Sequence, residues 1–237
     1  MIYIGAVFLL GALVAIHEFG HFVAGRMMGI PISVFSIGFG PRVAGFQWAE
    51  TDVRLSMIPL GGYVMPAVED ADEFLALSAR ARIIFALGGP VANILAAIPI
   101  IAMINVLSGD LSIYALLVAP WLQAGIILKG IMLAIPMIFA QPENISSVAG
   151  IAHAGGQFIS VGLVGALKFA AIISLNLAVF NMLPLPPLDG GKIALDIMER
   201  LHPKLSRAYA PACVVGWIAM IGLMLYATAN DIARLAA

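Results

Sequence analysis

Long stretches in which almost every residue is apolar alternate with shorter polar stretches along this chain. A helix that spans a bilayer needs about 20 apolar residues. Four stretches reach roughly that length with few ionisable side chains: residues 2–23, 83–107, 165–183 and 208–230. The pattern therefore predicts an all-α polytopic membrane protein with about four core transmembrane helices.

Residues 29–66 follow a different pattern. The segments "ISVFSIGFG" and "TDVRLSMIPLGGYV" alternate, are rich in β-branched and aromatic residues, and are interrupted by glycine and proline. We expect two or three short strands that form a membrane-associated β loop, since backbone outside helices is tolerated at membrane depth only where it pairs or lines a wet cavity. The acidic run from Glu69 to Glu73 predicts a solvated turn before the second helix.

A further apolar stretch, residues 111–140, contains Pro120, Lys129 and Pro136. Nine of the twelve Lys and Arg residues lie in two other places, between the first and second spans and between the last two spans. The positive-inside rule puts both groups on the cytoplasmic side, with both termini outside. A single crossing by 111–140 would separate them, so we predict an interfacial or re-entrant segment, with two short crossings as the alternative.

Composition supports the membrane assignment and narrows the chemistry. The chain is 62% hydrophobic and 11% charged, where a soluble domain carries about 25% charged residues. A net charge of −1 gives no indication of a nucleic-acid partner. The single cysteine, Cys213, excludes an internal disulfide framework and a cysteine-based zinc cluster.

The first span contains three ionisable residues, His17, Glu18 and His21, in "AIHEFGHFVAG". Helical geometry separates the two histidines by about 40° around the axis and about 6 Å along it, so both could reach one metal ion. This is the H-E-x-x-H arrangement of zinc hydrolases, in which the glutamate is the general base that activates a zinc-bound water. Because an intramembrane charge costs at least about 2.5 kcal/mol, we interpret the three residues as a site for one Zn²⁺ per chain.

A catalytic zinc needs a third protein ligand. His153 and His202 are interpreted as solvated loop residues. Asp189, in "FNMLPLPPLDGGK", is the better candidate. We expect the helix that contains the span 165–183 to cover 165–191 and to end in "LDGG", although Asp189 could instead cap a helix that begins near Gly190. The predicted topology favours the ligand, since it puts Asp189 and the two histidines near the same leaflet.

Taken together, these motifs resemble the site-2 protease family of intramembrane zinc metalloproteases. The chain has "HEFGH", then "GFGPR" (residues 38–42), "IPLGGYV" (58–64), "GGPVAN" (88–93) and the pattern N-x-x-P-x-P-x-L-D-G (181–190). The resemblance covers nearly the whole chain and is closest to the bacterial branch that cleaves anti-sigma factors. One departure is that residues 108–160 are too few and too apolar for the PDZ domain that this branch usually carries.

The resemblance implies a role for each matching residue. His17, His21 and Asp189 would bind zinc, and Glu18 would be the catalytic base. Asn181 would hold the substrate backbone or the oxyanion. Asn93 would be a structural amide between helices, with a role in the site left open. The strand that contains Gly61, Gly62 and Tyr63 would pair with an extended substrate.

The implied activity is that of a zinc metalloendopeptidase that cleaves within or next to transmembrane segments, in regulated intramembrane proteolysis. Residues 1–237 would form one multi-pass protease domain in the cell inner (plasma) membrane, with its active site near the cytoplasmic side. The substrate would be a transmembrane protein, with an anti-sigma factor or a signal-peptide remnant as candidates. Two alternatives stay open: a metal or proton transporter, against which the lack of repeats counts, and a protease-like binding or chaperone module.

Overall fold

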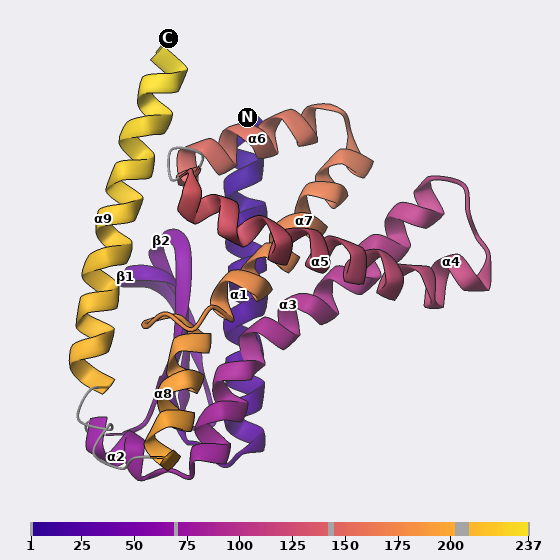
Figure 1. Cartoon of the computed structure of the whole chain (residues 1–237). Helices are drawn as coiled ribbons and strands as arrows, with labels where there is room; N and C mark the ends of the chain where they lie inside the picture. Colours follow the sequence, from indigo (N-terminus) through magenta and orange to yellow (C-terminus); the bar gives the residue numbers. More distant parts are fainter. Residues whose placement is uncertain (1, 69–70, 142–144, 202–208, 237) are drawn as a thin grey trace. The chain divides into compact units, whose positions relative to one another are not determined.

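Most of the chain is helical, with one pair of long strands near its start (Figure 1). The computed structural model describes residues 2–68, 71–141, 145–201 and 209–236. The elements are, in chain order, α1 (Ile2–Met27), β1 (Ile32–Trp48), β2 (Thr51–Pro66), α2 (Ala71–Ala76), α3 (Ala79–Leu107), α4 (Ile113–Leu117), α5 (Ala119–Ala140), α6 (Val148–Ser160), α7 (Leu163–Asn181), α8 (Asp189–Leu201) and α9 (Tyr209–Ala236).

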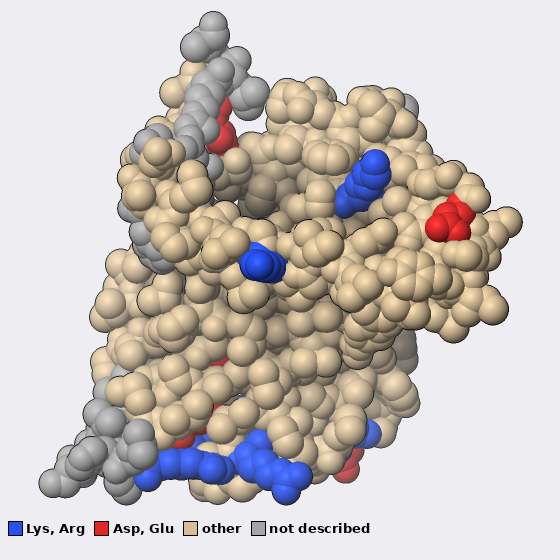
Figure 2. Space-filling view, turned by 45° about the vertical axis from the view of Figure 1, so that its right-hand side comes forward, with Lys and Arg blue, Asp and Glu red and all other residues tan. Residues whose placement is uncertain are grey.

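Five of the described helices, α1, α3, α5, α7 and α9, are long and apolar enough to cross a membrane. This confirms a polytopic membrane protein, and four of the five coincide with the predicted spans. The fifth, α5, falls in the stretch 111–140; its return to the same side stays a prediction, because length and apolarity do not determine whether a helix crosses. In Figure 2 most of the visible face is uncharged, and several charged side chains gather at its lower edge, with a few others apart from them.

The β loop is made of longer strands than the sequence suggested. β1 has 17 residues and β2 has 16, and they pair antiparallel. Residues 34–37 pair with 62–65 on one side and with 52–55 on the other, so the two elements form a small three-stranded sheet. Short strands were expected because glycines interrupt the pattern. Gly38 and Gly40 instead adopt positive φ (91° and 87°) within β1, where the register shifts and the strand continues.

The chain forms two compact units, each assembled from separate segments; the single domain expected for 1–237 therefore stays a prediction. The first unit contains residues 1–10, 94–179 and 218–237, and the second contains 11–93 and 180–217.

The second unit has its core between α1, the sheet and α3. The buried members are Phe22, Ile30, Ile32, Phe35, Ala81 and Phe85. α1 and α3 touch through small residues, because a Cβ added to Gly20 would lie 2.5 Å from the Ala92 Cβ. A larger side chain at Gly20 would separate the helices, so this glycine allows the close approach of α1 to α3.

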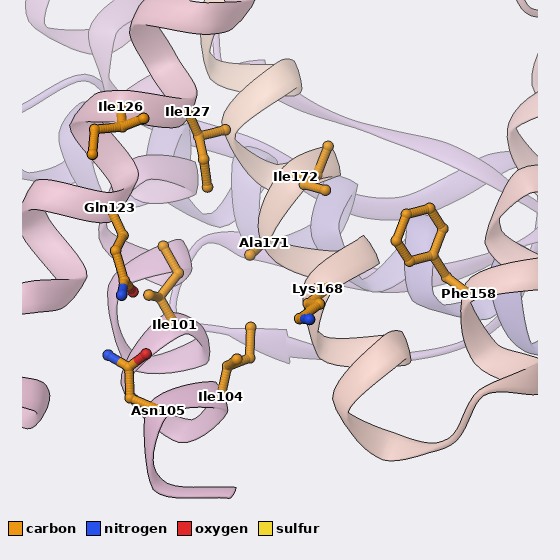
Figure 3. Close-up of a pocket in the computed structure, with 10 residues that line it drawn as sticks. All are labelled: Ile101, Ile104, Asn105, Gln123, Ile126, Ile127, Phe158, Lys168, Ala171 and Ile172. Carbon is orange, nitrogen blue, oxygen red and sulfur yellow. The ribbon is translucent and has the colours of Figure 1, made fainter. Parts of the chain in front are cut away.

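The first unit has a core of Ala97, Ile101, Ala124, Ala171 and Leu175. Beside it lies a cavity of about 420 Å³, lined mainly by isoleucines, in which Asn105, Gln123 and Lys168 are the polar members (Figure 3).

Two expectations about loops change, and a third, on His202, is not tested. His153 lies on α6 and stacks on Tyr3, with ring centroids 5.7 Å apart, so it is not a loop residue. A helix, α2, begins at Ala71 within the acidic run, since Asp and Glu suit a first helical turn; residues 69–70 lie outside the described part. His202 also lies outside it.

Candidate metal centre

Three buried side chains converge in the second unit. His17 and His21 are one turn apart on α1, and their Nε2 atoms are 3.1 Å from each other. The Asp189 Oδ2 is 3.1 Å from the His17 Nε2 and 3.2 Å from the His21 Nε2. Each of the three side chains is at most 7% exposed. The structure therefore brings together the three residues that the sequence selected, from positions 172 residues apart.

Asp189 begins α8, which corrects the expected helix over 165–191. α7 ends at Asn181, and the prolines at 184, 186 and 187 keep the next residues out of a helix. The chain folds back closely at this point, because a Cβ on Gly190 would lie 2.6 Å from the Leu183 carbonyl oxygen. Asp189 thus combines both interpretations of its sequence context, since it starts a helix and also lies against the histidines.

The donor set and its spacing suit a zinc ion. Zinc bonds of about 2.0–2.1 Å in a tetrahedron put neighbouring ligand atoms about 3.3–3.4 Å apart. The three donor separations here are 3.1, 3.1 and 3.2 Å, so a small movement would admit the ion. Two imidazoles and a carboxylate are a known catalytic donor set and leave the fourth position open to water or substrate.

α3 orients both imidazoles through their other nitrogen atoms. The His21 Nδ1 lies 2.8 Å from the Phe85 carbonyl oxygen, which can only accept, so Nδ1 carries the proton and Nε2 is free for a metal. The His17 Nδ1 lies 3.0 Å from the amide nitrogen of Asn93, a fully buried residue. Turning that amide over makes its oxygen the acceptor and frees the His17 Nε2 in the same way. Asn93 therefore contacts a ligand directly, which gives it more than a structural role between helices.

The free space around the imidazoles depends on a glycine of α3. A Cβ on Gly89 would lie 2.5 Å from the His17 Nε2 and would also collide with the His21 Nε2. The motif "GGPVAN" falls in the predicted span 83–107, but the sequence does not show which face of that helix meets the metal site. The motif lies in the interior of α3 and begins nine residues after the helix starts at Ala79.

The second oxygen of Asp189 has its own partner, Lys192, whose Nζ lies 3.1 Å from Oδ1 one turn along α8. Burial alone would raise the pKa of Asp189, but its hydrogen bonds with His17 and His21 and the charge of Lys192 hold the pKa well below its usual range. The carboxylate is therefore ionised at neutral pH. The i,i+3 spacing from Asp189 is the sequence signal for this contact, although by sequence Lys192 counts only as one of the nine basic residues that orient the spans.

Glu18 lies beside the sheet. A Cβ on Gly62 would come within 2.9 Å of the Glu18 Cγ, so β2 passes directly over the predicted base. Tyr63 stacks on Phe39 with ring centroids 6.1 Å apart, and its hydroxyl accepts a hydrogen bond from Arg54.

Two further predicted substrate residues have known places in the fold. Gly61 packs under the Phe39 ring, and Asn181 is the last residue of α7. The substrate-binding roles of Gly61, Gly62, Tyr63 and Asn181 stay predictions.

Comparison with known proteins agrees with this centre. The model of the family described as "Peptidase family M50" matches residues 5–225. A Clostridium perfringens protein named "Putative zinc metalloprotease CPE1693" is 25% identical, over 98% of this chain and 98% of the relative. A Campylobacter jejuni protein, "Putative zinc metalloprotease Cj1068", is 23% identical over 98% of this chain and 94% of the relative. A "Putative zinc metalloprotease" of Helicobacter pylori is 45% identical over 30% of this chain.

The alignment with the Clostridium protein has 331 positions, whereas this chain has 237 residues, so that relative has segments without a counterpart here. The family match nevertheless extends from α1 through α9 and includes the three clustered side chains. The relatives' names and the donor geometry of this chain agree on zinc as the metal. The chain belongs to peptidase family M50, the site-2 protease family, and is a multi-pass membrane zinc metallopeptidase.

Proposed function

We propose that this metallopeptidase hydrolyses peptide bonds within or next to transmembrane segments of other membrane proteins, with Glu18 as the general base. The observation that supports this most is the position of the donors. His17 and His21 belong to α1, which is apolar enough to span a bilayer, and all three donor side chains are buried.

His17, His21 and Asp189 would hold the zinc ion, which would supply a Lewis acid for the scissile carbonyl and for the attacking water. The Glu18 carboxylate, next to the first ligand, takes a proton from the attacking water and passes it to the leaving amine. The ionised Asp189 is held by Lys192 and so keeps its orientation while that proton moves.

The sheet supports a specific way of presenting the substrate. In a helix the peptide carbonyl is shielded by its own hydrogen bond, so a substrate must be extended before cleavage. Residues 62–65 of β2 pair with β1 on one side, and no further strand pairs with them among the described residues. An unwound substrate segment can add to this edge at Gly62, beside Glu18.

The biological setting belongs to the same proposal. We propose regulated intramembrane proteolysis in the cell inner membrane, with the site near the cytoplasmic side, where most of the basic residues were assigned. An anti-sigma factor or a signal-peptide remnant fits as substrate.

Cleavage of a single-pass membrane protein co-reconstituted in liposomes tests the proposal. Glu18→Gln should reduce cleavage by about 10²–10⁴-fold while zinc content is retained, because it removes only the base. Mass spectrometry should place the cut in or beside the apolar segment. Equal cleavage by wild type and Glu18→Gln, or a cut confined to the substrate's soluble domain, would contradict the proposal.

A further inference from the structure

One face of α3 serves the metal centre. Arg82, Phe85, Gly89 and Asn93 are spaced by three, four and four residues, which puts them in one row along the helix. Phe85 and Asn93 contact the second nitrogen atoms of the two histidines, and Gly89 leaves room for their rings. Arg82, the first residue of this row, contacts neither histidine, which raises the question of its purpose.

Arg82 is a buried cation that joins three segments of the second unit. Its Nε lies 3.0 Å from the Asp196 Oδ1, and its Nη2 pairs with Glu199, both on α8. Its Nη1 donates to the Leu75 carbonyl of α2 at 2.6 Å. The Arg82 side chain is 3% exposed and that of Asp196 is 2% exposed. The guanidinium is therefore fixed in position and holds α8 against the start of α3.

α8 also carries the third metal ligand. Asp189 and Asp196 are seven residues apart, about two turns or 10 Å along the helix axis. Side chains of α8 make polar contacts with other elements at two places along the helix. One is Asp189 with the histidines, and the other is the pairing of Asp196 and Glu199 with Arg82. These contacts hold α8 at its first residue and again two turns further along the helix.

We propose that Arg82 and Asp196 are positioning residues for the zinc ligand Asp189. By holding α8 two turns away, the ion pair holds the Asp189 carboxylate at the distance from His17 and His21 that the ion requires. All three ligands are then oriented from one row of α3, the histidines directly and the aspartate through α8.

The electrostatics of Asp196 favour a positioning role over a stabilising one. Burial raises the pKa of Asp196 to about 6 despite the attraction of Arg82; Glu199 also raises it, whereas Arg200 and Lys192 lower it. Ionised Asp196 is therefore costly inside the protein. A buried ion pair is often no more stabilising than apolar residues of similar size, but it specifies one arrangement.

Metal binding by the full-length protein in detergent tests the proposal without a substrate, so failure of the proposed function would leave the test unaffected. Asp196→Asn keeps the size of the side chain and removes the charge. We expect its affinity for zinc, measured by competition with a chelator, to fall by about 10-fold or more, as for other residues that orient a ligand. The visible spectrum of the Co²⁺-loaded protein should also change, because it reports ligand geometry.

Asp231→Asn is the matched control. Asp231 is also buried and also joins two helices, accepting from the Ser147 N–H at the start of α6, but it belongs to the first unit. We expect this variant to have a lower thermal midpoint with unchanged zinc affinity and Co²⁺ spectrum. If Asp196→Asn behaves like the control, the ion pair is only structural and the proposal is wrong.

Two further variants guard against loss of folding. Asp196→Glu keeps the charge but lengthens the side chain by one methylene, so α8 must shift to keep the ion pair. Arg82→Lys keeps the positive charge, but its single ammonium group cannot contact all three partners of the guanidinium. Both should fold, lower zinc affinity and alter the Co²⁺ spectrum. Wild-type affinity and spectrum in both would overturn the proposal.

Discussion

A single methyl group added at Gly89 should strongly weaken zinc binding. A Cβ there would lie 2.5 Å from the His17 Nε2 and 2.6 Å from the His17 Cε1. Comfortable contacts between such atoms are about 3.5–4.0 Å, so the overlap is about 1 Å. A metal site tolerates displacements of about 0.5 Å. Either the imidazoles rotate away or α3 shifts, and the histidine nitrogens no longer meet at one point.

Gly89→Ala should therefore lower zinc affinity by about 100-fold, at the upper end of what loss of a ligand-orienting group costs. Helix propensity acts in the opposite direction, because alanine favours a helix over glycine by about 1 kcal/mol. The two effects separate in a comparison with Gly125→Ala on α5, where an added Cβ meets nothing within 4 Å.

Zinc content after size exclusion, chelator competition and the thermal midpoint of the apo protein are the measurements. We expect Gly125→Ala to keep wild-type zinc affinity with an unchanged or higher midpoint. Gly89→Ala should lose zinc although its apo form stays folded. Full zinc content and affinity in Gly89→Ala would refute the reasoning, since the added methyl would then have found space that the structure does not show.

Three other changes have defined outcomes. Asn93→Ala should lower zinc affinity about 10–100-fold, because it removes the side chain that contacts the His17 Nδ1. Asn93→Asp can still accept a hydrogen bond from that nitrogen, so it should retain more of the zinc affinity. Competition with a chelator measures both variants. The pKa of Asp196 is raised to about 6 in the folded protein from 3.8, so the native state binds an extra proton between these two pH values. Wild type should therefore lose stability relative to Asp196→Asn as the pH rises from about 4 to 6, and the difference should level off above pH 7. Thermal midpoints of both proteins across this pH range are the measurement. Asp231→Asn should lower the thermal midpoint through the weaker acceptor left for the Ser147 N–H, and an unchanged midpoint would contradict this.

The apolar pattern was sufficient to predict the long helices α1, α3, α7 and α9, because a membrane span needs an apolar run of matching length. Helix ends and strand lengths were not, since they depend on local exceptions. Gly38 and Gly40 appeared to interrupt a strand and instead bend one. The expected helix that ended in "LDGG" is two helices, because the prolines of that motif separate α7 from α8.

The ligands of the site were predictable, whereas the groups that orient them were not. His17, Glu18 and His21 stand out because ionisable groups are costly in a span. The sequence gives no indication of the contact made by the Phe85 carbonyl oxygen, because every residue has a backbone carbonyl. By sequence, Arg82 is only one of the nine basic residues that orient the spans. Its contacts with Asp196 and Glu199 appear only in the structure.

Zinc affinity should depend on the second unit of the molecule and not on the first. α1 alone supplies two ligands at i,i+4, so a helix by itself can bind zinc only weakly, and the third ligand comes from α8. Every residue described as contacting a ligand, from α1, α3 and α8, belongs to the second unit. Zinc affinity is therefore a measure of how well α8 is docked within that unit. Substitutions in the first unit should change stability or substrate access without changing zinc affinity, whereas substitutions along the Arg82 to Asn93 row of α3 should change zinc affinity first.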